Sequence, residues 1–98
     1  MSNAMPAIFF GHGNPMNALA SNHYTEAWGR LGQAMPKPSS VLSISAHWFV
    51  PETSVTSSTA PRTIHDFGGF PRELYEVQYP APGSPPLAQR VQELLAPV

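Results

Sequence analysis

The chain has 98 residues, a formal net charge of −1 and only 11% charged residues. This length is typical of one small domain, which buries somewhat more than about 60% of its unfolded surface. The few Lys and Arg residues are scattered, which argues against a nucleic-acid-binding surface. The chain has no cysteine, so disulfides, a thiolate nucleophile and a cysteine-based zinc site are excluded, and a metal would need His, Asp or Glu.

The beginning of the chain carries no evident targeting segment. Its apolar stretch, Ala7–Phe10, is too short for a signal-peptide core or a membrane span. We therefore expect a cytoplasmic protein without a membrane partner. Residues 1–4, before a second methionine at Met5, look like a cloning scar, so the natural sequence is expected to occupy residues 5–98.

Three segments early in the chain predict a βαβ unit. Ala7–Phe10 is a short apolar run bounded by Pro6 and Gly11, as in a buried strand. The segment from Asn22 to Met35 has an N-capping residue and apolar residues at helical spacing, although two glycines weaken the pattern. Ser40–Ala46 reads as a second strand, and a right-handed crossover would make the two strands parallel.

A second helix is predicted after Ser84, which is a good N-cap followed by Pro85 at the first helical position. Its apolar face is formed by Leu87, Val91, Leu94 and Leu95. This face needs a surface to cover, and two short strands are marginal alone. The predicted fold class is therefore α/β: the βαβ start of a mostly parallel sheet with flanking helices, forming part of a larger single α/β domain.

Two histidines follow the predicted strands directly. His12 stands in "FFGHGNPM" and His47 in "VLSISAHWF". Ligands of open α/β sheets bind beyond the carboxyl ends of the strands, and neighbouring strands lie roughly 5 Å apart. The two imidazoles could therefore bind one metal ion, with the glycines beside His12 leaving room. The alternative is that each histidine is an ordinary loop residue bonded to nearby backbone.

Other candidate chemistry is sparse. We interpret His23, at the start of the predicted helix, as a surface residue. His65 and Asp66 in "TIHDFGGFP" form a possible acid–base pair, but adjacent side chains seldom face each other. The sequence has no phosphate-binding glycine loop and no nucleophile elbow.

Four motifs in order give the chain a family resemblance. They are "MPAIFFGHGNPMNAL", "VLSISAHWF", "TIHDFGGFP" and "ELYEVQYPAPGSPPLAQRV". Together they resemble the N-terminal part of the DOPA extradiol dioxygenases, in the class III (LigB-type) ring-cleaving superfamily. By this resemblance residues 5–98 are an incomplete, N-terminal part of the catalytic domain.

The resemblance implies a non-haem metal bound by His12 and His47, which stand in the two family motifs. The metal would be Fe(II) for activity, or Zn(II) as often found in bacterial relatives. The substrates would be a DOPA-like catechol and O₂, and ferrous iron with few protein ligands has open positions for both. The stretch from His65 to Pro71 would lie near the mouth of the site, with His65 in the substrate pocket but not a ligand.

Family members are considerably longer than this chain, and their acid–base histidine and remaining metal ligands lie later in the sequence. The catalytic residues are therefore unknown here, and the chain alone is expected to be inactive. Two alternatives stay open: a non-catalytic metal- or peptide-binding module on the same fold, and a zinc-bearing structural piece. The oligomeric state is undetermined.

Overall fold

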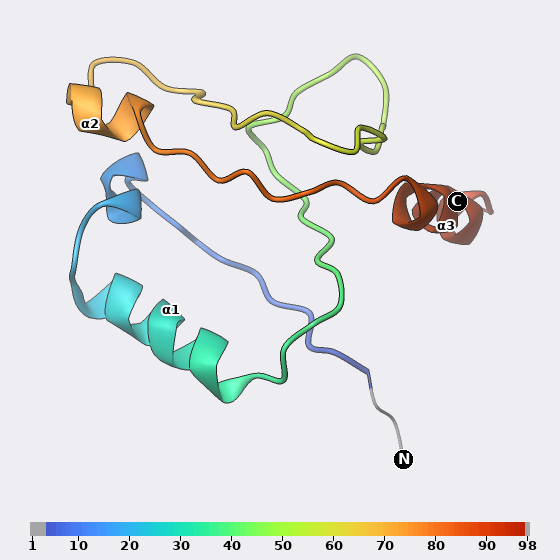
Figure 1. The fold of residues 1–98 in the computed structure, drawn as a ribbon, viewed down its shortest axis with the longest axis horizontal. Coiled ribbons are helices and arrows are strands. Elements are labelled where there is room, and N and C mark those ends of the chain that lie inside the picture. Colours follow the sequence, from blue (N-terminus) through green and yellow to red (C-terminus); the bar gives the residue numbers. More distant parts are fainter. Residues whose placement is uncertain (1–3, 98) are drawn as a thin grey trace. The chain divides into compact units, whose positions relative to one another are not determined.

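The computed structural model describes residues 4–97, which form helices joined by irregular segments (Figure 1). Residues 1–3 of the predicted scar, and Val98, lie outside this range. The helical elements are the 3-10 helix η1 (Pro15–Ala18) and the α-helices α1 (His23–Ala34), α2 (Arg72–Tyr75) and α3 (Pro85–Leu95). Within residues 4–97, no helix combines the length and the apolar character that crossing a membrane requires.

Helix α1 confirms the first predicted helix, and a capping box explains where it begins. The Asn22 side chain accepts hydrogen bonds from the backbone N–H groups of Tyr24 and Thr25, at 2.9 and 3.0 Å. In return, the Asn22 N–H donates to Thr25 Oγ1 at 2.8 Å. These bonds satisfy N–H groups that lack helical partners in the first turn, which stabilises a helix by about 1 kcal/mol.

Helix α3 confirms the second predicted helix. The Ser84 hydroxyl accepts a hydrogen bond from the Leu87 N–H at 3.3 Å, and the following prolines occupy positions where no N–H is needed. Ala88 is buried on this helix, whereas Leu94 and Leu95 stay more than half exposed. The predicted apolar face is therefore only partly covered.

Two short elements, η1 and α2, were not expected from the sequence. η1 begins at Pro15, and its N-cap Asn14 accepts a hydrogen bond from the Met16 N–H at 2.9 Å. α2 packs against η1 and buries Leu74, which is 2% exposed. The signal for η1 was present in the Asn-Pro dipeptide, because Asn caps helices and Pro suits their first position.

The predicted α/β fold class is wrong for residues 4–97, which contain no strand. Ala7–Phe10 and Ser40–Ala46 contain neither helix nor strand. Phe9 is 96% exposed and Ile44 is 93% exposed, so neither segment is buried as the apolar pattern predicted. Strands are stabilised by cross-strand pairs and by a covered apolar face, and apolar periodicity alone supplies neither.

The chain divides into two compact units, which we describe separately. The first comprises Met1–Ile44 and Phe67–Glu76, and the second comprises Ser45–Asp66 and Val77–Val98. In the first unit, Phe10 and Trp28 meet edge to face with ring centroids 6.1 Å apart. This contact joins the segment before His12 to helix α1.

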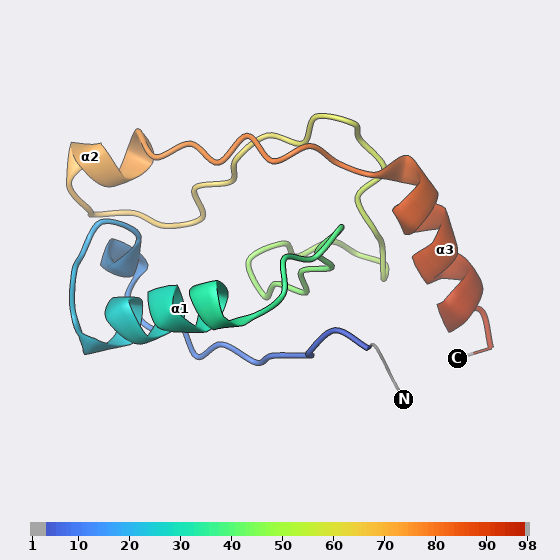
Figure 2. The ribbon, with the colours of Figure 1, turned by 60° about the horizontal axis from the view of Figure 1, so that its bottom comes forward.

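In the second unit, the extended segments 59–65 and 77–83 run antiparallel and side by side, as both views show (Figures 1 and 2). The Gly83 N–H donates to the Thr59 carbonyl at 3.0 Å, and the Tyr79 N–H donates to Thr63 Oγ1 at 3.0 Å. A regular ladder does not form because Pro80 and Pro82, in the second segment, have no N–H to donate.

Candidate functional site

His12 lies in an irregular segment of the first unit, not at the end of a strand. The two neighbouring glycines have different roles. Gly13 has φ 64°, in the left-handed region where a side chain is disfavoured, so the backbone itself favours glycine there. Gly11 has a negative φ, and an added Cβ would meet nothing within 4 Å. The structure therefore explains Gly13 through backbone conformation, whereas it leaves space around Gly11.

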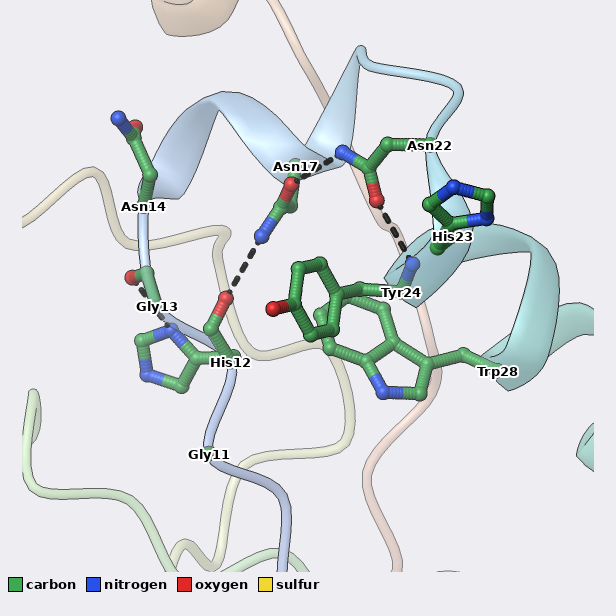
Figure 3. Close-up of a pocket in the computed structure, with 9 residues that line it drawn as sticks. All are labelled: Gly11, His12, Gly13, Asn14, Asn17, Asn22, His23, Tyr24 and Trp28. Carbon is green, nitrogen blue, oxygen red and sulfur yellow. Dashed lines mark hydrogen bonds between the residues drawn. The ribbon is translucent and has the colours of Figure 1, made fainter.

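The His12 backbone is connected to the cap of α1 by two asparagine side chains (Figure 3). Asn17 Nδ2 donates to the His12 carbonyl at 2.8 Å. Asn22 Nδ2 then donates to Asn17 Oδ1 at 2.9 Å, while Asn22 Oδ1 accepts from the first turn of α1. The sequence identified Asn22 only as a helix cap, and it did not indicate that Asn17 holds the backbone beside His12.

His12 borders an open pocket of about 520 Å³ within the first unit (Figure 3). Helix α1 contributes His23, Tyr24 and Trp28 to its lining, and the remaining wall is polar. Its lining residues are Gly11, His12, Gly13, Asn14, Asn17, Asn22, His23, Tyr24 and Trp28. His23 is exposed, as predicted, yet it is also among the residues that line this pocket. The combination of aromatic rings and amide groups suits a small polar aromatic molecule.

His47 lies in a turn of the second unit. The sequence predicted instead that it would follow the end of a strand. The backbone N–H of His47 donates to Ser45 Oγ at 3.1 Å, and the Trp48 N–H donates to the Ser45 carbonyl at 3.4 Å. Across 19 residues of sequence, His47 Nδ1 lies 3.0 Å from Asp66 Oδ2. Asp66 therefore pairs with His47, a contact that the sequence did not reveal.

His65 makes a different contact, although it adjoins Asp66 in the sequence. Its Nε2 lies 2.8 Å from the Val77 carbonyl oxygen. Because a carbonyl oxygen only accepts hydrogen bonds, Nε2 must carry the proton and donate. His65 therefore connects the two antiparallel segments of the second unit. The expected place of His65 in a substrate pocket stays a prediction.

The tautomers of His12 and His47 follow from the same reasoning. His12 Nδ1 lies 3.2 Å from the Gly13 carbonyl oxygen, and His47 Nδ1 faces a carboxylate. Both partners are acceptors, so each Nδ1 carries a proton, and in a neutral ring the lone pair is then at Nε2. Histidine ligands of metals commonly show this arrangement, with the second ring nitrogen donating to a carbonyl or carboxylate.

The donor chemistry of His12 and His47 therefore fits a metal such as iron or zinc, which imidazole nitrogen binds well. His12 belongs to the first unit and His47 to the second, so the structure describes each in its own surroundings. Their joint binding of one ion stays a prediction. Within residues 4–97, no group of three or more His, Asp or Glu side chains is arranged to hold a metal.

Several known proteins similar to this chain are named as dioxygenases. The 4,5-DOPA dioxygenase extradiol of Escherichia coli (strain K12) is 58% identical over 97 residues, which are 99% of this chain and 36% of that protein. The protein of the same name from Beta vulgaris is 44% identical over 98 residues, covering 96% of this chain and 36% of that protein. Dioxygenase tasH of Hapsidospora irregularis is 31% identical over 94 residues, covering 85% of this chain and 29% of that protein.

These similarities place the chain among relatives of the dioxygenases. More specifically, the chain is a homologue of the 4,5-DOPA extradiol dioxygenases, and it spans about 36% of their length. The family resemblance seen in the four motifs is thereby confirmed. No family model matches the chain, and no solved structure matches it significantly.

Proposed function

We propose that residues 5–98 are the N-terminal part of the catalytic domain of a non-haem metal-dependent extradiol dioxygenase, and that they supply two of its metal ligands. The observation that carries this proposal is that the rings of His12 and His47 have the same hydrogen-bonding arrangement. In both rings Nδ1 faces a hydrogen-bond acceptor at 3.0–3.2 Å, which makes Nε2 the metal-binding nitrogen. The homology to DOPA extradiol dioxygenases supports the same assignment.

The chain's own contribution to the reaction is to hold two imidazoles rigidly. Asn17 fixes the backbone at His12, and Asp66 fixes the ring of His47. The metal would be Fe(II) in the active protein, with Zn(II) as the other candidate, and it would bring the catechol and O₂ together so that the ring opens beside the diol.

The pocket beside His12 is the proposed place for the aromatic substrate. Tyr24 and Trp28 offer aromatic surface, and the asparagine amides offer donors and acceptors for hydroxyl groups (Figure 3). The substrate class we propose is a DOPA-like catechol, which rests on the names of the relatives. We propose further that the acid–base residue and the remaining ligands belong to the other two thirds of the relatives' length, so that this chain alone is inactive.

The proposal is tested on a protein that contains this sequence together with the remainder of the relatives' length. We expect the anaerobically Fe(II)-loaded protein, given O₂ and L-DOPA or another catechol, to form a yellow ring-opened product. His12→Ala and His47→Ala should each abolish product formation. Glu52→Ala is the control and should leave product formation unchanged, because Glu52 is exposed, does not line the pocket and stands outside both metal-ligand motifs. Failure across a catechol panel with bound iron would overturn the proposal.

A second candidate function is a non-catalytic metal- or peptide-binding module. Its supporting observation is the exposure of large apolar side chains, including Phe9, Ile44 and Phe49, each more than 90% exposed. Such surface in a folded protein is typical of an interaction site. A metal-loaded protein that binds a partner and turns over none of the catechols would favour this second function.

A further inference from the structure

The contact between His47 and Asp66 joins two side chains that are distant in the sequence but belong to the same unit. The Nδ1–Oδ2 distance is 3.0 Å, which is the usual length of an N–H···O hydrogen bond. Asp66 follows His65, and the His65 ring donates to the Val77 carbonyl at 2.8 Å. The carboxylate is therefore presented by a segment that is itself anchored.

The chemistry of this contact sets the state of the His47 ring. An ionised carboxylate has only acceptor sites, so the proton must lie on Nδ1 and the lone pair on Nε2. A free neutral imidazole instead interconverts between its two tautomers. The negative charge also raises the electron density of the ring, which makes Nε2 a stronger metal ligand.

We propose that Asp66 is a positioning residue for metal binding: it holds the His47 ring in one orientation and in the tautomer whose Nε2 binds the metal. This inference rests on the proposed metal role of His47. In the "HDFGGFP" motif, Asp66 would then orient the His47 ring. His65 would hold the backbone of the motif in place through its bond to the Val77 carbonyl. His12 has a backbone carbonyl in the corresponding position, so substitution of a side chain can test the arrangement at His47 but not at His12.

The size of the effect follows from the exposure of the pair. Loss of such a supporting carboxylate typically lowers metal affinity about 10- to 100-fold. The side chains of His47 and Asp66 are 47% and 57% exposed, so water screens their interaction. We therefore expect the lower end of this range, about tenfold, for Asp66→Ala.

The experiment uses a protein that contains this sequence together with the remainder of the relatives' length, to which the remaining metal ligands are assigned. It has two readouts. The first is the tautomer of His47, read from its imidazole ¹⁵N shifts by NMR without metal. The second is the affinity for Zn(II), measured by titration. Asp66→Ala should shift His47 toward a mixture of tautomers and weaken Zn(II) binding about tenfold. Asp66→Asn, whose amide oxygen can still accept from Nδ1, should restore most of both signals.

The control is Glu52→Ala, which removes one negative charge from an exposed position of the same unit. It should change neither readout. If Asp66→Ala behaves like Glu52→Ala while His47→Ala loses Zn(II) binding, the positioning role is overturned and the metal site stands. If His47→Ala binds Zn(II) as well as the unaltered chain does, the proposed metal role fails. The metal-free NMR readout then still decides whether Asp66 acts on the His47 ring.

Discussion

Gly83 is the position where the structure makes its sharpest prediction about packing. A Cβ added there would overlap the carbonyl oxygen of Ser58 and would lie 3.0 Å from the carbonyl carbon and 3.2 Å from Pro61 Cδ. The first two atoms belong to the backbone, so no change of rotamer can relieve the overlap. Gly83→Ala must therefore separate the two antiparallel segments of the second unit.

The magnitude combines two opposing effects. Forcing an extra carbon into a filled space costs about 1–3 kcal/mol, whereas replacing glycine by alanine recovers up to about 1 kcal/mol through the unfolded chain. The net expectation is a loss of about 1–2 kcal/mol, which corresponds to a roughly tenfold larger equilibrium constant for opening of the pairing.

Amide hydrogen exchange followed by NMR measures this opening directly. The informative amides are those of Tyr79 and of position 83, which donate to Thr63 and Thr59. Gly29→Ala is the matched control, because an added Cβ there meets nothing within 4 Å and lies in helix α1, where alanine should stabilise by about 0.5–1 kcal/mol. Unchanged exchange at both amides in Gly83→Ala would refute the described pairing.

Two further substitutions test the first unit. Asn22→Ala removes the capping box and the bond to Asn17, so far-UV circular dichroism should show less helix and a stability loss of about 1 kcal/mol; an unchanged spectrum and midpoint would contradict the cap. Leu74→Ala should lower the free energy of unfolding in urea by about 2 kcal/mol, since Leu74 is 2% exposed, while Leu94→Ala, at a 58% exposed position, should cost much less. Equal effects of the two leucine substitutions would argue against Leu74 as a core residue.

The predicted helices agree with the structure and the predicted strands do not, because helices depend on residues close in sequence and strands on residues far away. The two longer helices could be predicted because their signals are local: Asn22 and Ser84 cap the first turns that follow them. The strands at Ala7–Phe10 and Ser40–Ala46 were predicted from apolar runs alone. A strand depends on a neighbour far away in the sequence, and no apolar run specifies whether that neighbour is present.

The candidate site divides in the same way. His12 and His47 were predicted as metal ligands because each stands in a motif that resembles those of the extradiol dioxygenases. The homology confirms the family resemblance, and the ligand role stays a prediction. The partner of each ring was not recognisable. Asp66 adjoins His65 in the sequence, yet its carboxylate contacts His47, while His65 donates to the backbone of Val77.

The sequence by itself determined the helix starts, the absence of thiol chemistry and the family motifs that contain His12 and His47, because residue type and close spacing carry that information. The tertiary structure alone decided the acceptors that face Nδ1 of His12 and of His47, and the Asn17 bond behind His12. Each of these depends on a hydrogen bond between groups that only the folded backbone brings close together. Distance along the sequence does not predict such contacts. Asp66 was considered as a partner of its neighbour His65, yet its carboxylate contacts His47, 19 residues away.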